Sequence, residues 1–273
     1  MTLFQAFILG IVQGLTEFLP ISSSGHLVLV PFVFGWQLNP EQVFPFDTLV
    51  QMGTLVAVII YFWKDLVSIV KAVFKGLADQ KPFSTQQARL GWLLVLATIP
   101  AGVAGLLLED VIEAAFQSAI ATAIFLLLTA GLLLLAERLG KRSRKMDEMT
   151  WKDALWIGAA QMLALFPGVS RSGSTMAGGM TRDLKRSDAA RFSFLMSVPV
   201  MLAAGAYSVY KLLKMPELSD FLPVMAIGFI TAGMVGYLSI RWLLGYLQNH
   251  SLKGFAIYCA AVAVIILILS YVL

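Results

Sequence analysis

The chain has 273 residues, of which 59% are hydrophobic and 13% are charged, and its mean hydropathy is +0.82. A soluble domain carries about 25% charged residues, so this composition excludes a water-soluble globular protein and indicates a polytopic membrane protein. A spanning helix needs about 20 apolar residues, so the apolar runs fill almost the whole length and predict one integral membrane domain, residues 1–273. The net charge of +4 comes from basic residues between apolar runs, a distribution that does not indicate nucleic-acid binding.

Residues 1–36 form an apolar segment that breaks at Pro20 and contains one charged residue, Glu17. An ionisable group at membrane depth costs about 2.5–3.5 kcal/mol on insertion scales, so its presence indicates a functional site. Gln13 precedes Glu17 by four residues and lies on the same helical face. An amide and a carboxylate offer oxygen ligands for a hard cation such as Mg²⁺ or Ca²⁺; the alternative is a polar pair that joins two helices.

A serine run and a histidine follow the break, in Ser22-Ser23-Ser24-Gly25-His26. One of the serines is expected to cap the next helix. A histidine close to a serine and a carboxylate can activate a hydroxyl nucleophile or act as a general acid or base. A buried histidine is more often a core residue, but the isolated Glu17 nearby favours a functional role for His26.

Six apolar runs are long enough to span a membrane, and the Lys/Arg content of the loops between them sets their orientation. The predicted spans are residues 46–63, 90–108, 118–136, 192–210, 222–244 and 254–273. Loops 64–89 and 137–152 are rich in Lys and Arg and are expected to be cytoplasmic. The linker 108–118 carries acids and no base, so it is expected to lie outside.

Residues 152–181 must then enter and leave on the cytoplasmic side, because the segment 182–191 is also basic. This segment breaks at Pro167-Gly168, and each of its arms is too short to cross the bilayer. The pattern predicts a re-entrant helix pair, and residues 1–36 are predicted to form a second pair that enters from outside. The alternative is that both segments are kinked spans.

The turn of the second segment reads Pro167-Gly168-Val169-Ser170-Arg171-Ser172-Gly173-Ser174-Thr175 and carries the only charge between Asp153 and Arg182. Arg171 offers a planar fork for bidentate contact with phosphate, and Ser170, Ser172 and Thr175 add hydroxyl donors. The residues that follow can open a helix whose N-terminus favours an anion. The turn therefore predicts phosphate binding, since an ordinary serine-rich turn does not account for a buried arginine.

The two broken segments are related in sequence at an offset of 148 positions. The identities are Gly10/Gly158, Gln13/Gln161, Leu15/Leu163, Phe18/Phe166, Ser22/Ser170, Ser24/Ser172 and Gly25/Gly173. The predicted fold is therefore an all-α polytopic membrane protein with six spanning helices, two re-entrant helix pairs and an inverted-topology repeat, whose copies are residues 1–137 and 151–273. Broken backbone at membrane depth is tolerated only inside protein or beside a wet cavity. We call the interrupted part of each segment its tip: the first tip contains Pro20 and the second contains Pro167-Gly168. The two tips are expected to meet.

The two segments together carry the residue types that hydrolysis of a phosphoanhydride requires. The first holds the acid and the imidazole, and the second holds the guanidinium. A cation and Arg171 would neutralise the phosphates, while the first segment would supply the proton-transfer chemistry.

QGLTEFLPISSSGH and PGVSRSGST resemble the two signature motifs of the BacA-type undecaprenyl-diphosphate phosphatases, and the resemblance covers essentially the full length. It implies a membrane enzyme that removes the terminal phosphate of undecaprenyl diphosphate with a divalent cation, Mg²⁺ or Ca²⁺. The implied catalytic residues are Glu17, Ser23, His26 and Arg171; Ser170, Arg171, Ser172 and Thr175 would bind the diphosphate, and Gln13 and Glu17 are the expected metal ligands. The first motif begins with Glu or Gln in this family, so Gln13 is a permitted variant that removes one carboxylate. Whether Ser23 or His26 attacks phosphorus stays open.

The resemblance also implies a cellular role and a place in the cell. The enzyme would recycle the lipid carrier of peptidoglycan synthesis, support cell-wall biogenesis and cell shape, and confer bacitracin resistance. It would be a multi-pass protein of the bacterial inner membrane with its active site on the extracytoplasmic side. Its partners would be the lipid substrate and membrane lipids, and the sequence leaves the oligomeric state open, a homo-oligomer included. Broken helices in inverted repeats are also typical of secondary transporters, so the alternative function is a flippase of the polyprenyl phosphate carrier.

Overall fold

The structure is a computed structural model that describes residues 1–116, 118–212 and 218–272. Within these ranges the side chains at 40, 41, 44, 109, 113, 204, 206–212, 218–220 and 272 lie outside the description. The described ranges contain helices α1 to α12 and one 3-10 helix, η1, with no strand beyond an isolated bridge between Arg144 and Leu184. The all-α class predicted from the sequence is confirmed.

The first helix pair consists of α1 (Leu3–Thr16) and α2 (Ser23–Val33), both too short to cross a bilayer. α1 begins at a capping box formed by Thr2 and Gln5, and α2 begins at Ser22, whose hydroxyl accepts a hydrogen bond from the Gly25 N–H. α1 packs along α11 (Leu218–Tyr246) because it presents glycines there. A Cβ on Gly10 would lie 2.8 Å from the Gly228 carbonyl oxygen, so only glycine allows this approach.

The first half continues with α3 (Pro40–Tyr61), which bends by 78° into α4 (Trp63–Ala78), then α5 (Gln86–Leu107), the short α6 (Glu109–Phe116) and α7 (Ala119–Leu139). The sequence predicted a loop over residues 64–89, and this was wrong for most of that stretch. α4 is a helix because its apolar residues recur at helical spacing on one side while its lysines occupy the other. α4 packs against α5 through this apolar side.

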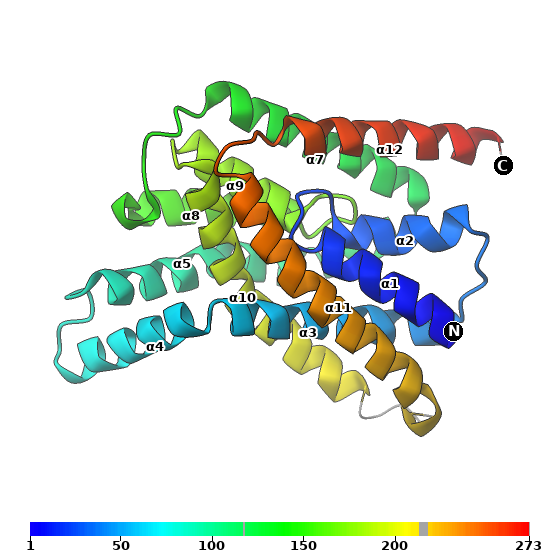
Figure 1. Cartoon of the computed structure of the whole chain (residues 1–273), viewed down its shortest axis with the longest axis horizontal. Helices are drawn as coiled ribbons and strands as arrows, with labels where there is room; N and C mark the ends of the chain where they lie inside the picture. The colour runs from blue at the N-terminus through cyan, green and yellow to red at the C-terminus, as the bar shows by residue number, and fades with distance from the viewer. Residues whose placement is uncertain (117, 213–217, 273) are drawn as a thin grey trace.

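The second half begins with η1 (Met146–Glu148) and the helix pair α8 (Trp151–Leu163) and α9 (Arg171–Thr181). The long helices α10 (Arg186–Leu212), α11 and α12 (Lys253–Val272) follow. Figure 1 shows α1 and α2 at one end of the molecule and α8 and α9 at the other, with the loops inside the two pairs meeting in the middle. Both predicted breaks, at Pro20 and at Pro167-Gly168, are confirmed as helix interruptions.

Among the described residues, α5, α7, α11 and α12 are long and apolar enough to span a membrane, and the bent pair α3–α4 is a fifth candidate. α10 occupies the position of the predicted span 192–210, but several of its side chains are not described. The chain is therefore a multi-pass helical membrane protein, while the count of six spans and the division into two inverted copies remain predictions.

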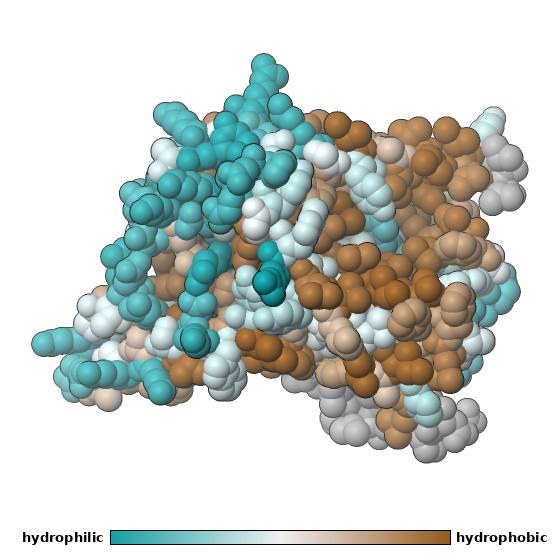
Figure 2. All heavy atoms as spheres, in the orientation of Figure 1, coloured by the Kyte–Doolittle hydropathy of each residue, from teal (hydrophilic) through white to brown (hydrophobic). Residues whose placement is uncertain are grey.

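Hydrophilic residues gather at one end of the molecule, the left side of Figure 2, and the remainder of this face is largely hydrophobic. We call this end, which carries the loops 140–150 and 182–185, the basic end. Two buried acids organise it. Asp153 accepts hydrogen bonds from Arg144 and Arg182, and Glu137 pairs with Arg142 and Arg186. Burial disfavours the charge of Asp153, but the bonds from Arg144 and Arg182 outweigh it and hold its pKa well below the ordinary value.

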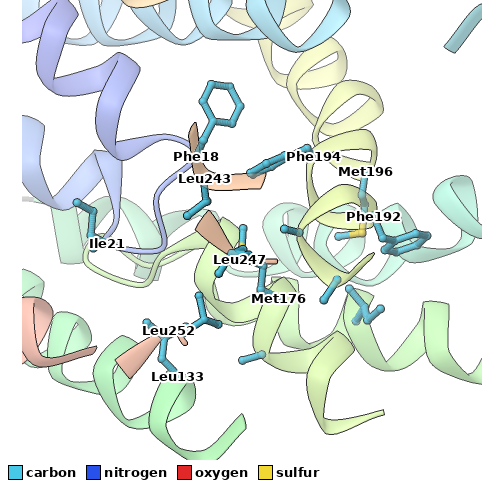
Figure 3. Close-up of a cluster of buried hydrophobic side chains, with 14 of the residues drawn as sticks. Phe18, Ile21, Leu133, Met176, Phe192, Phe194, Met196, Leu243, Leu247 and Leu252 are labelled. Carbon is cyan, nitrogen blue, oxygen red and sulfur yellow. The ribbon is translucent and has the colours of Figure 1, made fainter. Parts of the chain in front are cut away.

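The core joins the tip of the first pair to the long helices. Figure 3 shows Phe18, next to Glu17, packed against Phe194 of α10, and their rings meet edge to face with centroids 5.3 Å apart. Ile21 lies in the same buried cluster as Leu133 of α7 and Leu243 of α11. Burial of these large side chains fixes the position of a tip that has little regular backbone hydrogen bonding of its own.

Candidate active site

The two interrupted tips meet inside the molecule, as the sequence predicted. Ser172 Oγ, at the start of α9, donates a hydrogen bond of 3.1 Å to the carbonyl of Leu19 in the first tip. Gly168 has φ +94°, and a Cβ there would lie 2.1 Å from the carbonyl oxygen of Thr122 in α7. Glycine at this position lets the second tip turn while it touches another backbone.

Glu17 is the centre of the site, and three donors from both tips converge on its carboxylate. Gln13 Nε2 donates to Oε2 at 3.0 Å, Ser23 Oγ donates to Oε2 at 2.6 Å, and Arg171 Nη2 donates to Oε1 at 2.7 Å. The Glu17 side chain is 3% exposed and that of Arg171 is 14% exposed. These three donors hold the buried carboxylate in one orientation.

Arg171 is the first residue of α9, and its guanidinium extends from the second tip to the first. Besides Glu17 it contacts the Ser193 carbonyl, which accepts from Nη1 at 3.5 Å, and the sulfur of Met201 lies 4.0 Å from Nη2. The first backbone N–H groups of α9 have no acceptor within the helix, so they and the guanidinium can bind the same anion.

The hydroxyls predicted to bind phosphate are at the same turn, but each also has a partner within the protein. Ser170 caps α9 by accepting from the Gly173 N–H at 3.0 Å. Ser172 bonds to the first tip, as described above. Thr175 Oγ1 donates to the Arg171 carbonyl at 2.7 Å and lies 2.6 Å from the Ser193 hydroxyl. The structure thus positions these three side chains as supports of the Arg171 turn.

His26 lies beside the site without contacting Glu17 or Ser23 through either ring nitrogen. Nδ1 lies 2.7 Å from the Ser22 carbonyl, and Nε2 lies 2.9 Å from the hydroxyl of Tyr258 in α12. A carbonyl only accepts, so Nδ1 carries a proton and donates to Ser22, while Nε2 pairs with the Tyr258 hydroxyl. The imidazole therefore links the first tip to α12.

A divalent cation fits this site only in partnership with a substrate. The described residues contain no cluster of three or more His, Cys, Asp or Glu side chains that could hold a metal ion. The oxygen donors are the Glu17 carboxylate, the Gln13 amide oxygen and the Ser23 hydroxyl. Mg²⁺ is commonly bound by one or two carboxylates together with phosphate oxygens, so these residues suit an ion shared with a phosphorylated ligand.

Three contributors were missed from the sequence: Thr129, Ser193 and Tyr258. Thr129 in α7 donates to the Gly168 carbonyl at 2.9 Å and accepts from the Ser170 N–H at 3.0 Å, so it fixes the second tip. Ser193 supports Arg171 and Thr175 from α10. All three are polar side chains inside apolar runs, and a polar residue in such a run is the sequence feature that could have indicated a contact with the tips.

The two segments that are related in sequence differ at the position of the buried acid. Gln13 donates to Glu17, whereas its counterpart Gln161 has a leucine, Leu165, four residues further on. Both amide atoms of Gln161 are buried with no partner among the described residues. The acid is therefore supplied once, by the first segment, and the arginine once, by the second.

Comparison with known proteins places these residues in a family context. The chain matches the family described as "Bacitracin resistance protein BacA" over residues 6–265. It is 48% identical to the undecaprenyl-diphosphatase of Chlorobium phaeobacteroides (strain BS1), an alignment that covers 98% of this chain and 96% of the relative. It is 43% identical to the undecaprenyl-diphosphatase of Myxococcus xanthus (strain DK1622), covering 98% and 89%. Its identity to the protein of that name in Methanosphaera stadtmanae is 41%, with 98% of both chains covered.

Proposed function

We propose, on the premise that this chain belongs to the bacitracin resistance protein BacA family, that it is an undecaprenyl-diphosphatase. It hydrolyses undecaprenyl diphosphate to undecaprenyl phosphate and inorganic phosphate, which makes the lipid carrier available again for peptidoglycan synthesis and supports resistance to bacitracin. The observation that carries the proposal is the convergence of Ser23 and Arg171 on the buried Glu17. The names of the relatives favour this hydrolase over the alternative of a flippase.

Arg171 and the first turn of α9 bind the diphosphate in this proposal. The guanidinium has donors beyond the one that Glu17 occupies, and its planar fork matches two phosphate oxygens. Thr175 and Ser193 bond to each other and support the turn that carries Arg171. Ser170 caps α9 by accepting from the Gly173 N–H, so the other N–H groups of the first turn of α9 can bind the anion. These donors stabilise the negative charge that accumulates on the transferred phosphoryl group.

Ser23 is the nucleophile that the geometry favours. Its hydroxyl donates to Glu17 at 2.6 Å, so Glu17 can take the proton as Ser23 Oγ forms a bond to the terminal phosphorus. The bond from that phosphorus to the bridging oxygen breaks, and undecaprenyl phosphate leaves with the electron pair. A water molecule then attacks the phosphoserine, inorganic phosphate leaves, and the proton returns from Glu17 to Ser23. His26 holds the first tip in place through Ser22 and Tyr258.

A divalent cation, Mg²⁺ or Ca²⁺, is part of the proposal. Glu17 and Gln13 would hold it through their oxygen atoms together with the substrate phosphates. When bound, it supplies positive charge that offsets the phosphate oxygens. Glu17 has a single carboxylate for both Arg171 and the ion, so binding of the diphosphate must draw Arg171 toward the phosphates.

The protein is proposed to reside in the bacterial inner membrane with the basic end in the cytoplasm and the substrate admitted from the extracytoplasmic side. The Lys/Arg content of the loops at the basic end supports this orientation. The first tip, with Ser23, is connected to the opposite end through α1 and α2 (Figure 1). The polyprenyl chain would remain in the bilayer while the diphosphate reaches the tip.

The decisive experiment measures phosphate release from undecaprenyl diphosphate by the purified protein in detergent. The native protein is expected to turn over, to stop when a chelator is added, and to recover with Mg²⁺ or Ca²⁺. Ser23→Ala is expected to be inactive, whereas Ser68→Ala, at an exposed serine on α4, keeps full activity. Native protein that moves the lipid between leaflets of a vesicle without releasing phosphate would instead establish the transporter. Full turnover in chelator would remove the cation from the proposal and leave the hydrolase intact.

A further inference from the structure

A groove away from the candidate active site opens at the basic end, between the first half of α5 and the start of α8. Its volume is about 820 Å³, within the range of roughly 300–1,000 Å³ usual for small-molecule sites. One wall is the α5 face that carries Arg89, Trp92, Leu96 and Ile99, and the other is the turn from Met149 to Lys152. None of these residues contributes to the contacts around Glu17.

The groove changes in character along its length. Residues 89, 92, 96 and 99 recur at helical spacing, so they form one stripe about 15 Å long from the polar end of α5 toward its apolar middle. Arg89 stands at the polar end of the stripe, and Ile99, which is 51% exposed, stands at the apolar end. Such a groove presents a cation at the membrane surface and an apolar track toward the bilayer interior.

Two cations at the rim have no acidic partner. Neither Arg89 nor Lys152 forms an ion pair with any residue that the structure describes. Lys152 Nζ lies 5.6 Å from the ring centroid of Trp151, and no Asp or Glu lines the groove. The rim therefore complements a negative charge.

Aromatic side chains flank these cations in the way expected at a membrane–water interface. Trp92 donates from Nε1 to the Pro82 carbonyl at 3.1 Å, and its ring centroid lies 6.3 Å from that of Phe83. Trp151 is 59% exposed on the facing wall. Tryptophan rings settle at the depth of lipid headgroups, so the rim lies at headgroup level and the track lies at the level of the acyl chains.

We propose that this groove binds an anionic glycerophospholipid of the leaflet at the basic end, with its phosphate between Arg89 and Lys152 and an acyl chain along Leu96 and Ile99. Basic pockets between transmembrane helices on the cytoplasmic side are suited to such headgroups. The lipid would cover the open side of the α5–α8 contact, where Gly158 lies so close to α5 that a Cβ would be 2.5 Å from the Ala97 carbonyl oxygen. Because α8 leads into the tip that carries Arg171, occupancy steadies that tip.

The test compares phosphatidylglycerol with phosphatidylcholine of the same acyl chains, added to the purified full-length protein and followed by native mass spectrometry. The native protein is expected to retain phosphatidylglycerol roughly tenfold better, given two cations near the headgroup. Arg89→Gln with Lys152→Gln is expected to bring the two lipids to parity. Ile99→Trp, which fills the apolar track, is expected to reduce retention of both.

The matched control removes the same charge elsewhere. Lys71→Gln with Lys75→Gln, on exposed positions of α4 that do not line the groove, keeps the preference for phosphatidylglycerol. The proposal fails if the native protein holds both lipids equally, if the α4 variant loses the preference equally, or if inorganic phosphate alone displaces the lipid. Displacement by undecaprenyl phosphate at equal concentration would also overturn it, because the groove would then be a product site.

Discussion

At the scale of single residues, the candidate site depends on one carboxylate that serves several donors at once. Glu17 binds the Ser23 hydroxyl through one oxygen and Arg171 through the other, so the proposed nucleophile and the proposed anion-binding group are positioned by the same side chain. A buried ion pair contributes little net stability, because desolvation offsets the attraction, but loss of one partner leaves the other charge uncompensated. Activity and stability are therefore coupled at this position.

Glu17→Gln is expected to abolish phosphate release and also to destabilise the protein by about 3 kcal/mol, since the Arg171 guanidinium, 14% exposed, is left without its partner. Adding Arg171→Gln to Glu17→Gln removes the orphaned charge and is expected to recover part of the melting temperature without recovering activity. Thermal unfolding in detergent and phosphate release, measured on both variants, check this. A double variant no more stable than the single one would contradict the ion pair.

Tyr258→Phe tests how His26 is held. The substitution keeps the ring but removes the hydroxyl that lies 2.9 Å from His26 Nε2. We expect kcat to fall roughly tenfold with little change in KM, because His26 would lose the partner in α12 through which it positions the first tip and Ser23. Tyr271→Phe, on the same helix at a 93% exposed position, is the control and should match the native enzyme. A lower melting temperature with unchanged kcat would show that the contact serves the fold alone.

At the scale of elements, the tips depend on backbone conformations that few residues adopt. Ser22 has φ +71° although it is not a glycine, and it caps α2 from that conformation. Such residues store strain of about 1–3 kcal/mol and persist only where their surroundings fix them. The neighbouring residues supply these contacts: Gly25 lies against Gly168 of the second tip and Thr122 of α7, and His26 pairs with Tyr258 of α12.

Gly168→Ala is expected to cost at least about 2 kcal/mol, since φ +94° is unfavourable for alanine and the new Cβ would meet the Thr122 carbonyl. Gly131→Ala on α7 is the comparison: a Cβ there meets nothing within 4 Å, and alanine in a helix is as stable or up to about 1 kcal/mol more stable. Melting temperatures of the two variants should move in opposite directions or differ clearly. Equal values would argue against the close approach of the second tip to α7.

Much of the fold follows from local sequence, and the exceptions have physical causes. Pro20 and Pro167-Gly168 mark the helix interruptions, and isolated Glu17 and Arg171 mark the site, because proline and buried charge carry strong costs whatever the tertiary structure. The helix α4 was not predicted, because its lysines are typical of a loop between spans. Its apolar residues recur at helical spacing, and this pattern indicates a surface helix. The contact between His26 and Tyr258 joins residues 232 positions apart, and no local pattern specifies such a pairing.

At the scale of the whole molecule, the hydrophilic surface lies at one end, and most of the remaining surface in Figure 2 is hydrophobic. The hydrophilic end contains the ion pairs of Glu137 and Asp153, and Figure 2 shows that the surface becomes hydrophobic away from it. The pair of Glu137 with Arg186 joins α7 to α10, and the pair of Asp153 with Arg182 joins α8 to the residue that follows α9. The Lys and Arg residues of this end are the basis of the proposed orientation of the chain in the membrane.

The orientation predicts which positions a membrane-impermeant thiol reagent reaches in intact cells. A cysteine at Ala114, on α6, is expected to react from outside, whereas a cysteine at Ser143, in the loop of the basic end, is expected to react only after lysis. The native cysteine, Cys259, is buried, so the native protein is expected to remain unlabelled and serves as the control. Labelling in the reverse pattern would invert the topology, and with it the side from which the diphosphate arrives.

The ion pair between Glu17 and Arg171 joins positions 154 residues apart, and this separation bears on how such a protein could have arisen. A gene encoding the first half alone would specify Glu17 without Arg171, and a gene encoding the second half alone would specify Arg171 without Glu17. Two fragments divided between α7 and α8 should therefore complement each other only when expressed together. If residues 1–137 and 151–273 are copies of one ancestral segment, as the sequence predicts, an ancestor half this size would have paired as an antiparallel dimer, and fusion into one chain would have allowed the first copy to keep the acid and the second to keep the arginine.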